Sequence, residues 1–451
     1  MKHCCPRINA NERKFFVSAP AAYHAQINAF VFFRVHLRLF ADKLLLNFMT
    51  KKYDIIIIGG GMVGASLVAA LKSHADKKIA VVEAHEFNSR SQPSFDDRCI
   101  ALSYGSRRIW ESMVLWEKLE PEIEAIKSIH VSDRGHLGAT RITRTEEKVE
   151  ALGYVVENRV MGKVLMDEVG SLKHIDWFCP ATIQSLAQSD DQLEIKIKTD
   201  EGEQKLQAKL LVAADGVQSV TRKLAGLDVK REDYNQSAII TNVQTDQLHQ
   251  GIAYERFTHS GPIAFLPMTE NRYSVVWTCE QNDTDRIMQL MDDEFINELQ
   301  QRFGHRAGNI EKIGERFSYP LAYTQTEQLT KGRVVIIGNA AHALHPVSGQ
   351  GYNLALRDVA ELAEMIVANN DPGHALLLAE YHAKRLKDMQ RVYRITDTMV
   401  KVFSNDNMAL GHIRASALIV LGLISPLRSL MARQSMGLLG RMNKLQRRLS
   451  L

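Results

Sequence analysis

The sequence predicts an α/β (α+β) protein in which a doubly wound, mostly parallel sheet domain is interrupted by an antiparallel-sheet domain and followed by a helical C-terminal segment. A short apolar run, several glycines and a helix-like pattern follow one another from Tyr53. Four apolar runs typical of buried parallel strands are spread over residues 53–342. The stretches between them alternate polar and apolar residues, as half-buried antiparallel strands do.

The first apolar run opens a Rossmann-like βαβ unit. Residues 53–73 read YDIIIIGGGMVGASLVAALKS, and IAVVE at 79–83 supplies the next strand. The motif Gly59-x-Gly61-x-x-Gly64 permits a tight turn, close approach of a pyrophosphate and close packing of the following helix. The N-terminal amides of that helix favour a phosphate group.

Glu83 ends the second strand, 19 residues beyond Gly64. An acidic residue there accepts hydrogen bonds from the hydroxyls of an adenosine ribose, so the pattern predicts a dinucleotide site. It does not separate FAD from NAD. The alternative is a structural glycine turn with a surface glutamate.

Two later runs predict further strands of the same sheet. LLVAADG ends at Gly216, and RVVIIGNAAH ends at His342. Since the strand ends are far apart in the chain, they predict one nucleotide-binding domain assembled from separate pieces. Alternation at 192–199 and at 272–279 predicts the strands of an inserted, sheet-based second domain.

Composition bounds the protein class and the cofactors that it can hold. The 451 residues are 45% hydrophobic and 24% charged, which is typical of globular proteins and not of fibrous, disordered or polytopic membrane chains. The five cysteines, at 4, 5, 99, 179 and 279, lack metal-ligand spacing. Neither a disulfide framework nor a metal site is therefore expected, and a reducing compartment fits best.

The charge is concentrated at the two ends of the chain. Residues 1–48 hold seven Lys or Arg against two acids, and residues 407–451 hold seven with no acid. Subtracting these +5 and +7 from the net +4 leaves the middle at −8. An acidic middle repels phosphate and the basic ends carry no recognisable binding motif, so a nucleic-acid partner is not expected.

The first 48 residues read differently from the rest. Their broken apolar stretch, 30–40, contains Arg34 and Arg38 and is too short and too charged to span a bilayer. We expect an over-extended start, with the native chain beginning at Met49, in preference to a transit-like or interfacial segment.

Four later segments carry a resemblance to a known family. They are DRCIAL at 97–102, ADG at 214–216 with Ser219 and Arg222, GNAAH at 338–342, and HPVSGQGYNL at 345–354. With the glycine motif, they make residues 53–400 resemble the class A FAD-dependent aromatic hydroxylases related to para-hydroxybenzoate hydroxylase. The resemblance implies tightly bound FAD, with NAD(P)H as a transient co-substrate.

The resemblance also implies cofactor roles for residues in the first two segments. Arg98 would lie against the diphosphate and ribityl region of FAD, where a guanidinium is an apt donor; a structural loop arginine is the alternative. Asp215 and Gly216 would contact FAD and the nicotinamide nucleotide, although Asp215 could instead cap a helix.

The last two segments would surround the flavin ring. Gly338 and Asn339 occupy the position that binds a ribityl hydroxyl, with Asn339 in place of the usual Asp. The backbone near Gly351, Tyr352 and Asn353 would face the pyrimidine edge, and Gly349 would be a further cofactor-binding residue. His342 and His345 are interpreted as structural in preference to acid–base or metal roles, and spacing alone names no catalytic residue.

Within the class, the stretch SIHVSDRGHLG at 128–138 looks like the ubiquinone-biosynthesis hydroxylases that act on 2-polyprenyl-6-methoxyphenol. The implied reaction uses NAD(P)H and O2 and passes through a flavin hydroperoxide. Alternatives are hydroxylation of another ring position, or a flavin-bound, non-catalytic subunit of a multi-enzyme ubiquinone-biosynthesis complex. A plain NAD-dependent dehydrogenase is disfavoured by the segments at 97–102 and 338–342.

The expected organisation follows from these assignments. The parts are a leader at 1–48, FAD-binding pieces at 53–130, 206–230 and 331–400, mixed segments at 131–205, a substrate domain at 231–330, and a basic helical segment at 401–451. In the last part ALIVLGLISPL at 417–427 is too short to span a membrane. It either lies on an anionic bilayer or packs as a helical pair on the core, which makes the expected location cytoplasmic with peripheral contact at the inner face of the membrane.

Overall fold

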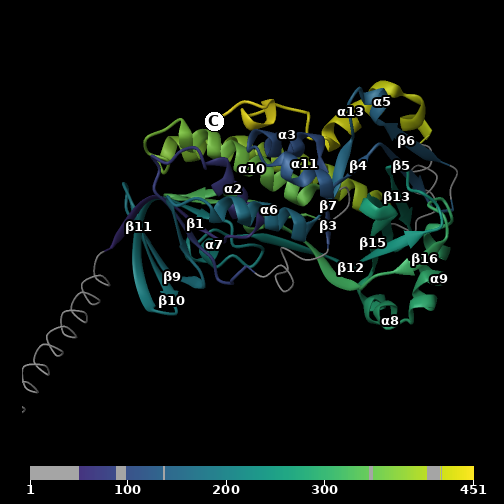
Figure 1. The fold of residues 1–451 in the computed structure, drawn as a ribbon, viewed down its shortest axis with the longest axis horizontal. Coiled ribbons are helices and arrows are strands. Elements are labelled where there is room, and N and C mark those ends of the chain that lie inside the picture. The colour runs from purple at the N-terminus through teal and green to yellow at the C-terminus, as the bar shows by residue number, and fades with distance from the viewer. Residues whose placement is uncertain (1–49, 88–97, 136–137, 345–348, 404–416, 418) are drawn as a thin grey trace, which may run out of the picture. The chain divides into compact units, whose positions relative to one another are not determined.

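The computed structural model describes residues 50–87, 98–135, 138–344, 349–403, 417 and 419–451 (Figure 1). The expected leader, Asp97, His345 and most of the loop before Gly349 lie outside these residues. Residues 52–451 form one compact unit built on three sheets.

The first sheet contains the predicted βαβ unit. Its strands are β1 (Lys51–Ile58), β2 (Ile79–Val82), β8 (Ile175–Phe178), β9 (Ala181–Gln188), β10 (Leu193–Thr199), β11 (Gly202–Ala213), β18 (Thr330–Lys331) and β19 (Val334–Ile336). The order is β18-β19-β11-β1-β2-β8, with β9 and β10 attached to β11. β1 is parallel to β2, β2 to β8, and β11 to β19, so the sheet is doubly wound at its centre as predicted.

One strand lies in a different sheet from the one expected. The sequence pattern assigned residues 192–199 to the inserted domain, but β10 pairs antiparallel with β9 and with the first half of β11. The assignment was wrong because β11 is twelve residues long and serves two partners: its first half continues a hairpin, and its second half is a buried strand beside β19.

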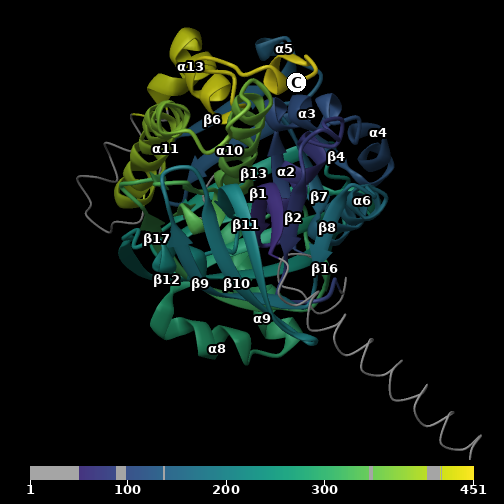
Figure 2. The same cartoon turned by 90° about the vertical axis from the view of Figure 1, so that its left-hand side faces the viewer.

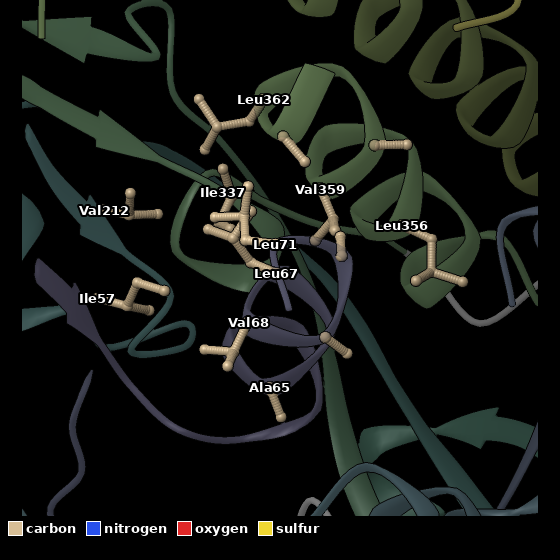
Figure 3. Packing of buried hydrophobic residues seen from close by; sticks show 14 of the residues in the cluster. Ile57, Ala65, Leu67, Val68, Leu71, Val212, Ile337, Leu356, Val359 and Leu362 are labelled. Atoms are coloured by element: carbon tan, nitrogen blue, oxygen red, sulfur yellow. The ribbon is translucent and has the colours of Figure 1, made fainter. Parts of the chain in front are cut away.

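Helices cover this sheet and bury its apolar side chains. They include α2 (Met62–Ala70), α3 (Tyr104–Ser112), α6 (Asn158–Gly170), α10 (Gln350–Val367) and α11 (Ala375–Phe403). Figure 3 shows Leu67 of α2 on the side of that helix that faces α10, which carries Val359. α2 is apolar on all sides because it lies between the sheet, α6 and α10.

The second sheet is antiparallel apart from one strand pair, as the alternating pattern predicted. Its order is β20 (His342–Ala343), β17 (Phe317–Gln325), β12 (Lys230–Thr245), β15 (Arg272–Glu280), β14 (Gly261–Met268), β13 (Ile252–Thr258), β5 (Ser128–Asp133) and β6 (Ala139–Thr143), with β16 (Ile310–Ile313) beside β12. β13 and β5 are parallel. One face packs on α8 (Thr284–Met288) and α9 (Asp292–Phe303), which lie on the side away from α10 and α11 (Figure 2).

A small third sheet and short helices complete the fold. The sheet is β3 (Cys99–Ser103), β7 (Gly153–Glu157) and β4 (Glu124–Ile126), and the helices are α4 (Trp116–Leu119), α5 (Arg144–Glu147), α7 (Val220–Leu224) and α13 (Ser425–Ser435). α13 packs on α5 and β6. Met436 and Leu445 are buried in the main core, so the end of the chain returns to α3 and α10.

Candidate functional site

Four of the predicted strand ends lie side by side at one edge of the first sheet. The N–H of Gly59 donates to Val82 O at 2.8 Å, and the N–H of Ala214 donates to Ile58 O at 2.7 Å. The N–H of Ile337 donates to Ala213 O at 3.0 Å. We call this the strand-end edge: the residues that follow β2, β1, β11 and β19 in that spatial order. Ligands of doubly wound folds bind in such a crevice at the carboxyl ends of the strands.

Three glycines of the turn after β1 and the start of α2 have no room for a side chain. A Cβ on Gly59, whose φ is +100°, would lie 2.5 Å from Ala214 O. A Cβ on Gly64 would lie 1.9 Å from Gly59 O. A Cβ on Gly60 would lie 2.6 Å from the Trp177 ring. The sequence did not indicate Trp177 as a neighbour of the glycine turn, because β8 contains no glycine motif. The turn therefore carries no side chains at the position where a phosphate would approach its backbone.

Glu83 is fastened to the glycine turn and remains partly accessible. One carboxylate oxygen accepts the Gly60 N–H at 2.6 Å, and the other accepts the His85 N–H at 2.9 Å. α2 begins at Gly61 with no side chain capping it. Free helix amides and a half-buried carboxylate provide the donors and the acceptor that a dinucleotide needs.

The ADG segment adopts the geometry of the capping alternative. The Asp215 carboxylate accepts hydrogen bonds from the Ser219 hydroxyl and from the backbone and hydroxyl of Thr221, at the start of α7. Arg222 is 4% exposed and donates to Ala340 O at 2.7 Å. The buried Arg222 guanidinium therefore connects the ADG segment to the GNAAH segment.

A buried cluster of charged residues fixes the GNAAH segment at 338–342. The Asp358 carboxylate accepts from Gly338 N at 3.1 Å, from His342 Nε2 at 2.7 Å and from Arg385 Nε at 2.8 Å. Burial alone raises the pKa of Asp358, but Arg385 and His342 outweigh it and hold that pKa below its ordinary value. His342 is 1% exposed and belongs to this cluster, in agreement with a structural role, whereas Asn339 is exposed at the edge.

The start of α10 is fixed by Asn353. Its side-chain oxygen accepts the Ser103 N–H at 2.8 Å, and its amide donates to Ala101 O at 2.8 Å and to Gly349 O at 2.6 Å. Since the side chain is fully engaged with the start of α10 and with β3 and α3, only the backbone here remains for a ligand.

Gly351 leaves space at the start of α10. A Cβ on Gly351 would meet nothing within 4 Å. No side chain caps α10, and the Tyr352 hydroxyl lies 2.9 Å from Ser66 Oγ, which joins α10 to α2. The helix dipole at this end favours negative charge.

Arg98 lies at a cavity between the second sheet and residues in or next to the third sheet. Its guanidinium stacks on the Tyr319 ring of β17, 4.5 Å from the ring centre. The cavity has a volume of about 570 Å³ and is lined in part by Arg98, Glu157, Ile240, Arg272 and Phe317. The Glu157–Arg272 ion pair, at 3.0 Å, spans β7 and β15 there.

The groups gathered at the strand-end edge fit FAD. The bare glycine turn, the uncapped starts of α2 and α10, and the accessible Glu83 and Asn339 fit the phosphates, ribose and ring of FAD. Among the described residues, no group of three His, Cys, Asp or Glu is placed to hold a metal ion. Within the same residues, no helix has the length and apolarity needed to cross a bilayer.

Comparison with known proteins agrees with this geometry. The profile of the FAD binding domain family matches residues 52–396. Ubiquinone hydroxylase UbiL of Rhodospirillum rubrum is 34% identical over 86% of this chain and 90% of its own length. 3-Demethoxyubiquinol 3-hydroxylase of Escherichia coli is 29% identical over 78% of this chain and 90% of its own.

Solved structures show the same fold at lower identity. p-Nitrophenol 4-monooxygenase PnpA from Pseudomonas putida superposes with a TM-score of 0.72 over 87% of this chain and 100% of its own, at 18% identity. The predicted fold class is therefore confirmed. The site assignments rest on the geometry given above.

Proposed function

Because the chain belongs to the FAD binding domain family and is closely similar to ubiquinone hydroxylases, we propose that it hydroxylates the aromatic ring of a prenylated phenol in ubiquinone biosynthesis. Family membership makes it an FAD-dependent monooxygenase that uses NAD(P)H and O2. The observation that carries the substrate class is the 34% identity to UbiL over nearly the whole of both chains.

In this proposal the strand-end edge holds the cofactor. The start of α2 and Arg98 bind the diphosphate, Glu83 binds the adenosine ribose, and Asn339 accepts from a ribityl hydroxyl. The backbone from Gly349 to Asn353 meets the pyrimidine edge of the flavin. Support comes from the missing caps and from the absence of room for side chains at the glycines.

When bound, FAD accepts a hydride from NAD(P)H and activates O2 for insertion into an electron-rich ring. The residues of the chain orient the two rings and exclude water. Residues 231–330, which contribute most of the second sheet, are proposed to supply the substrate side, because that sheet faces the third sheet and the start of α10.

The specific substrate proposed is 2-polyprenyl-6-methoxyphenol. A second candidate is hydroxylation at another ring position in the same pathway, which is favoured by the similarity to the Escherichia coli 3-demethoxyubiquinol 3-hydroxylase.

Purified protein should be yellow, release FAD on denaturation, and oxidise NAD(P)H faster when a prenylated phenol is added. Mass spectrometry of the product distinguishes the positions. Flavin-loaded protein that never hydroxylates either phenol contradicts the proposal and favours a non-catalytic subunit.

The C-terminal segment supports peripheral contact with an anionic membrane, from which such a greasy substrate would be drawn. Seven large apolar side chains are exposed within thirteen residues: Ile419, Val420, Leu423, Ile424, Leu427, Leu430 and Met431. We call them the apolar patch. No acidic residue occurs from 407 to 451, and Arg433 is exposed beside the patch. Residues 436–447 pack on the core, so the packed alternative holds for that part only.

Vesicle binding tests the apolar patch. The double variant Leu423→Gln, Leu430→Gln should lose cosedimentation with phosphatidylglycerol vesicles, and wild-type binding should weaken with salt because each basic residue adds about 1 kcal/mol at an anionic surface. Leu248→Gln, at an equally exposed leucine far from the patch in sequence, is the control. Wild-type protein that ignores anionic vesicles at low salt would remove the membrane from the proposal.

A further inference from the structure

The two faces of the second sheet differ in accessibility. The face toward α9 is sealed: Phe265, Val275 and Ile239 are each 0% exposed. On the adjacent positions of the same strands, Ala264, Val276 and Ile240 are only partly buried. Since neighbouring residues of a strand point to opposite faces, the second face is less completely covered at these positions.

The pairing register aligns one row of residues across this accessible face. The row runs from β6 to β17 through directly paired positions: Thr140, Val131, Glu255, Ala264, Val276, Ile240 and Phe317. Six of these seven are partly buried, and Ile240 and Phe317 also line the cavity that contains Arg98. Every member except Thr140 and Glu255 is apolar. A carboxyl in such a row is unusual, because a charged group avoids an apolar surface unless it has a partner.

The Glu255 side chain points toward the flavin side of the sheet. Ala253, two residues before it, belongs to the main core, whereas Tyr254 packs on the small core under α9. On β14 the same face continues to Met268, whose sulfur lies 3.5 Å from Cys99 Sγ of β3. β3 in turn carries Ala101, whose side chain would lie 3.2 Å from a Cβ on Gly349 at the start of α10.

Distance along the sheet separates Glu255 from the contact with β3. Glu255 pairs with Ala264, which is four residues, or about 13 Å at 3.3 Å per residue, from Met268. The carboxyl and the Met268 end of β14 therefore lie on one face, with the partly buried Leu266 between them.

In the part of the chain that the structure describes, this carboxyl has no charged partner. Among the described residues, the Glu255 carboxyl makes no hydrogen bond or ion pair. Its side chain is only partly buried, and its oxygens are not among the fully buried polar atoms. Arg256 and Tyr254 point to the opposite face, and Asp133 is the one other titratable side chain on this face of the two flanking strands. Burial raises the pKa of Glu255 from 4.5 to about 7, and no charged group among the described residues adds to or opposes this shift.

We propose that Glu255 is the catalytic residue that receives the proton of the phenolic hydroxyl of the substrate. In this step the phenolic O–H bond breaks, its electron pair stays on the ring oxygen, and the proton binds a Glu255 carboxylate oxygen. The ring becomes more electron-rich and more reactive toward oxygen. After oxygen transfer, the proton returns to that ring oxygen in the product. The inference rests on the proposed function, because it requires a phenol as substrate.

A carboxyl that titrates near neutral pH suits this task. A general base works best when its pKa lies near the operating pH, and such catalysis contributes roughly 10²- to 10⁴-fold in rate. An ordinary surface glutamate, with a pKa near 4.3, is a weaker base for a phenol whose pKa is about 10. Because only the ionised carboxyl accepts the proton, the rate should rise with pH through about 7.

The test uses full-length, FAD-loaded protein and a 6-methoxyphenol with one isoprene unit as the probe. Glu255→Gln should lower kcat by about 100-fold or more with a smaller change in KM, and should abolish the rise of kcat near pH 7. Glu255→Asp should recover part of the rate and keep the rise. Glu280→Gln, at an exposed glutamate on the end of β15, should match wild type. FAD content should be the same in all four proteins.

An infrared measurement gives a readout besides activity. The wild-type minus Glu255→Gln difference spectrum should contain a protonated-carboxyl band that titrates near pH 7 and shifts when the phenol binds. A Glu255→Gln variant with wild-type kcat and an unchanged pH profile overturns the inference and leaves the proposed function intact. If wild type hydroxylates no phenol, the proposed function fails. The inference is then overturned as well if the carboxyl band is absent or does not shift when the phenol is added.

Discussion

The strand-end edge and the accessible face of the second sheet, which we propose for the cofactor and the substrate, are built differently. At the edge the chain offers backbone, because side chains at Gly59, Gly60 and Gly64 would overlap other atoms. On the accessible face it offers partly buried side chains. The comparison teaches that the cofactor region depends on shape that a single added carbon disrupts. The substrate face depends on which side chain stands at each position, so it can change without breaking the fold.

The largest expected effect comes from the charge cluster behind the edge. Asp358→Asn removes the carboxylate that Arg385 and His342 share, although Arg385 keeps its ion pair with Asp388. Removal of one partner of a buried pair costs about 3–5 kcal/mol in unfolding free energy. Since the folded pKa of Asp358 is lowered, its contribution is present above the unfolded pKa near 3.9 and is lost as pH falls through the folded pKa.

Urea unfolding at pH 7 and near pH 3 measures this effect. The difference between wild type and Asp358→Asn should shrink at the lower pH. Asp285→Asn, at an exposed aspartate of α8, should leave the unfolding free energy unchanged. Equal stability of Asp358→Asn and wild type at pH 7 would show that the cluster does not hold the edge.

A methyl group at Gly64 should have the next largest effect. A Cβ 1.9 Å from Gly59 O forces α2 away from the turn, so Gly64→Ala should lose about 3 kcal/mol of stability and most of its bound FAD. The matched control is Gly170→Ala at the end of α6, where a Cβ meets nothing within 4 Å. Flavin absorbance after gel filtration reports the loss, and full FAD content in Gly64→Ala would contradict the role of backbone shape.

Glu83→Ala should weaken FAD binding more than it weakens the fold. The variant loses a charged acceptor for the ribose, worth on the order of 1.5–3 kcal/mol, or roughly a tenfold to a hundredfold rise in the Kd of FAD. Glu86→Ala, three residues along and exposed, should keep wild-type affinity. Flavin titration of the apoprotein decides, and an unchanged Kd removes Glu83 from the ribose site.

The smallest expected effect belongs to the accessible face. The folded pKa of Glu255, about 7, lies above its ordinary 4.5, so the stability of wild type falls as pH rises through this window. Glu255→Gln should therefore match the Tm of wild type below pH 4.5 and exceed it by about 2 °C at pH 8. A Tm difference that is the same at both pH values would mean that Glu255 does not ionise in this window.

Several features of the site were readable without a structure. The glycine spacing after an apolar run, the acid at position 83 and the GNAAH segment predicted four strand ends at one site, and the structure brings β2, β1, β11 and β19 together in that way. These signals are local, because a turn that must approach a phosphate needs glycine whatever the rest of the chain does.

Other features lacked a local signal. The role of Asp215 stayed open between cofactor contact and helix capping, and only the position of α7 shows where its hydrogen bonds go. Glu255 was passed over because a polar residue in an alternating strand normally faces water. The pattern AYERF at 253–257 does mark Glu255 as sharing a face with two apolar residues, which is the signal that could have found it.

The sequence by itself determined the cofactor half: the βαβ unit, the glycine turn and the segments that converge on it. It did so because backbone shape is encoded by residues close together in the chain. The tertiary structure alone decided that β10 joins the first sheet, that Arg222 and Asp358 lock separate segments together, and that Glu255 stands in an apolar row on the accessible face. Each of these depends on strand register or burial, which the pairing and packing of whole elements set and a local motif does not.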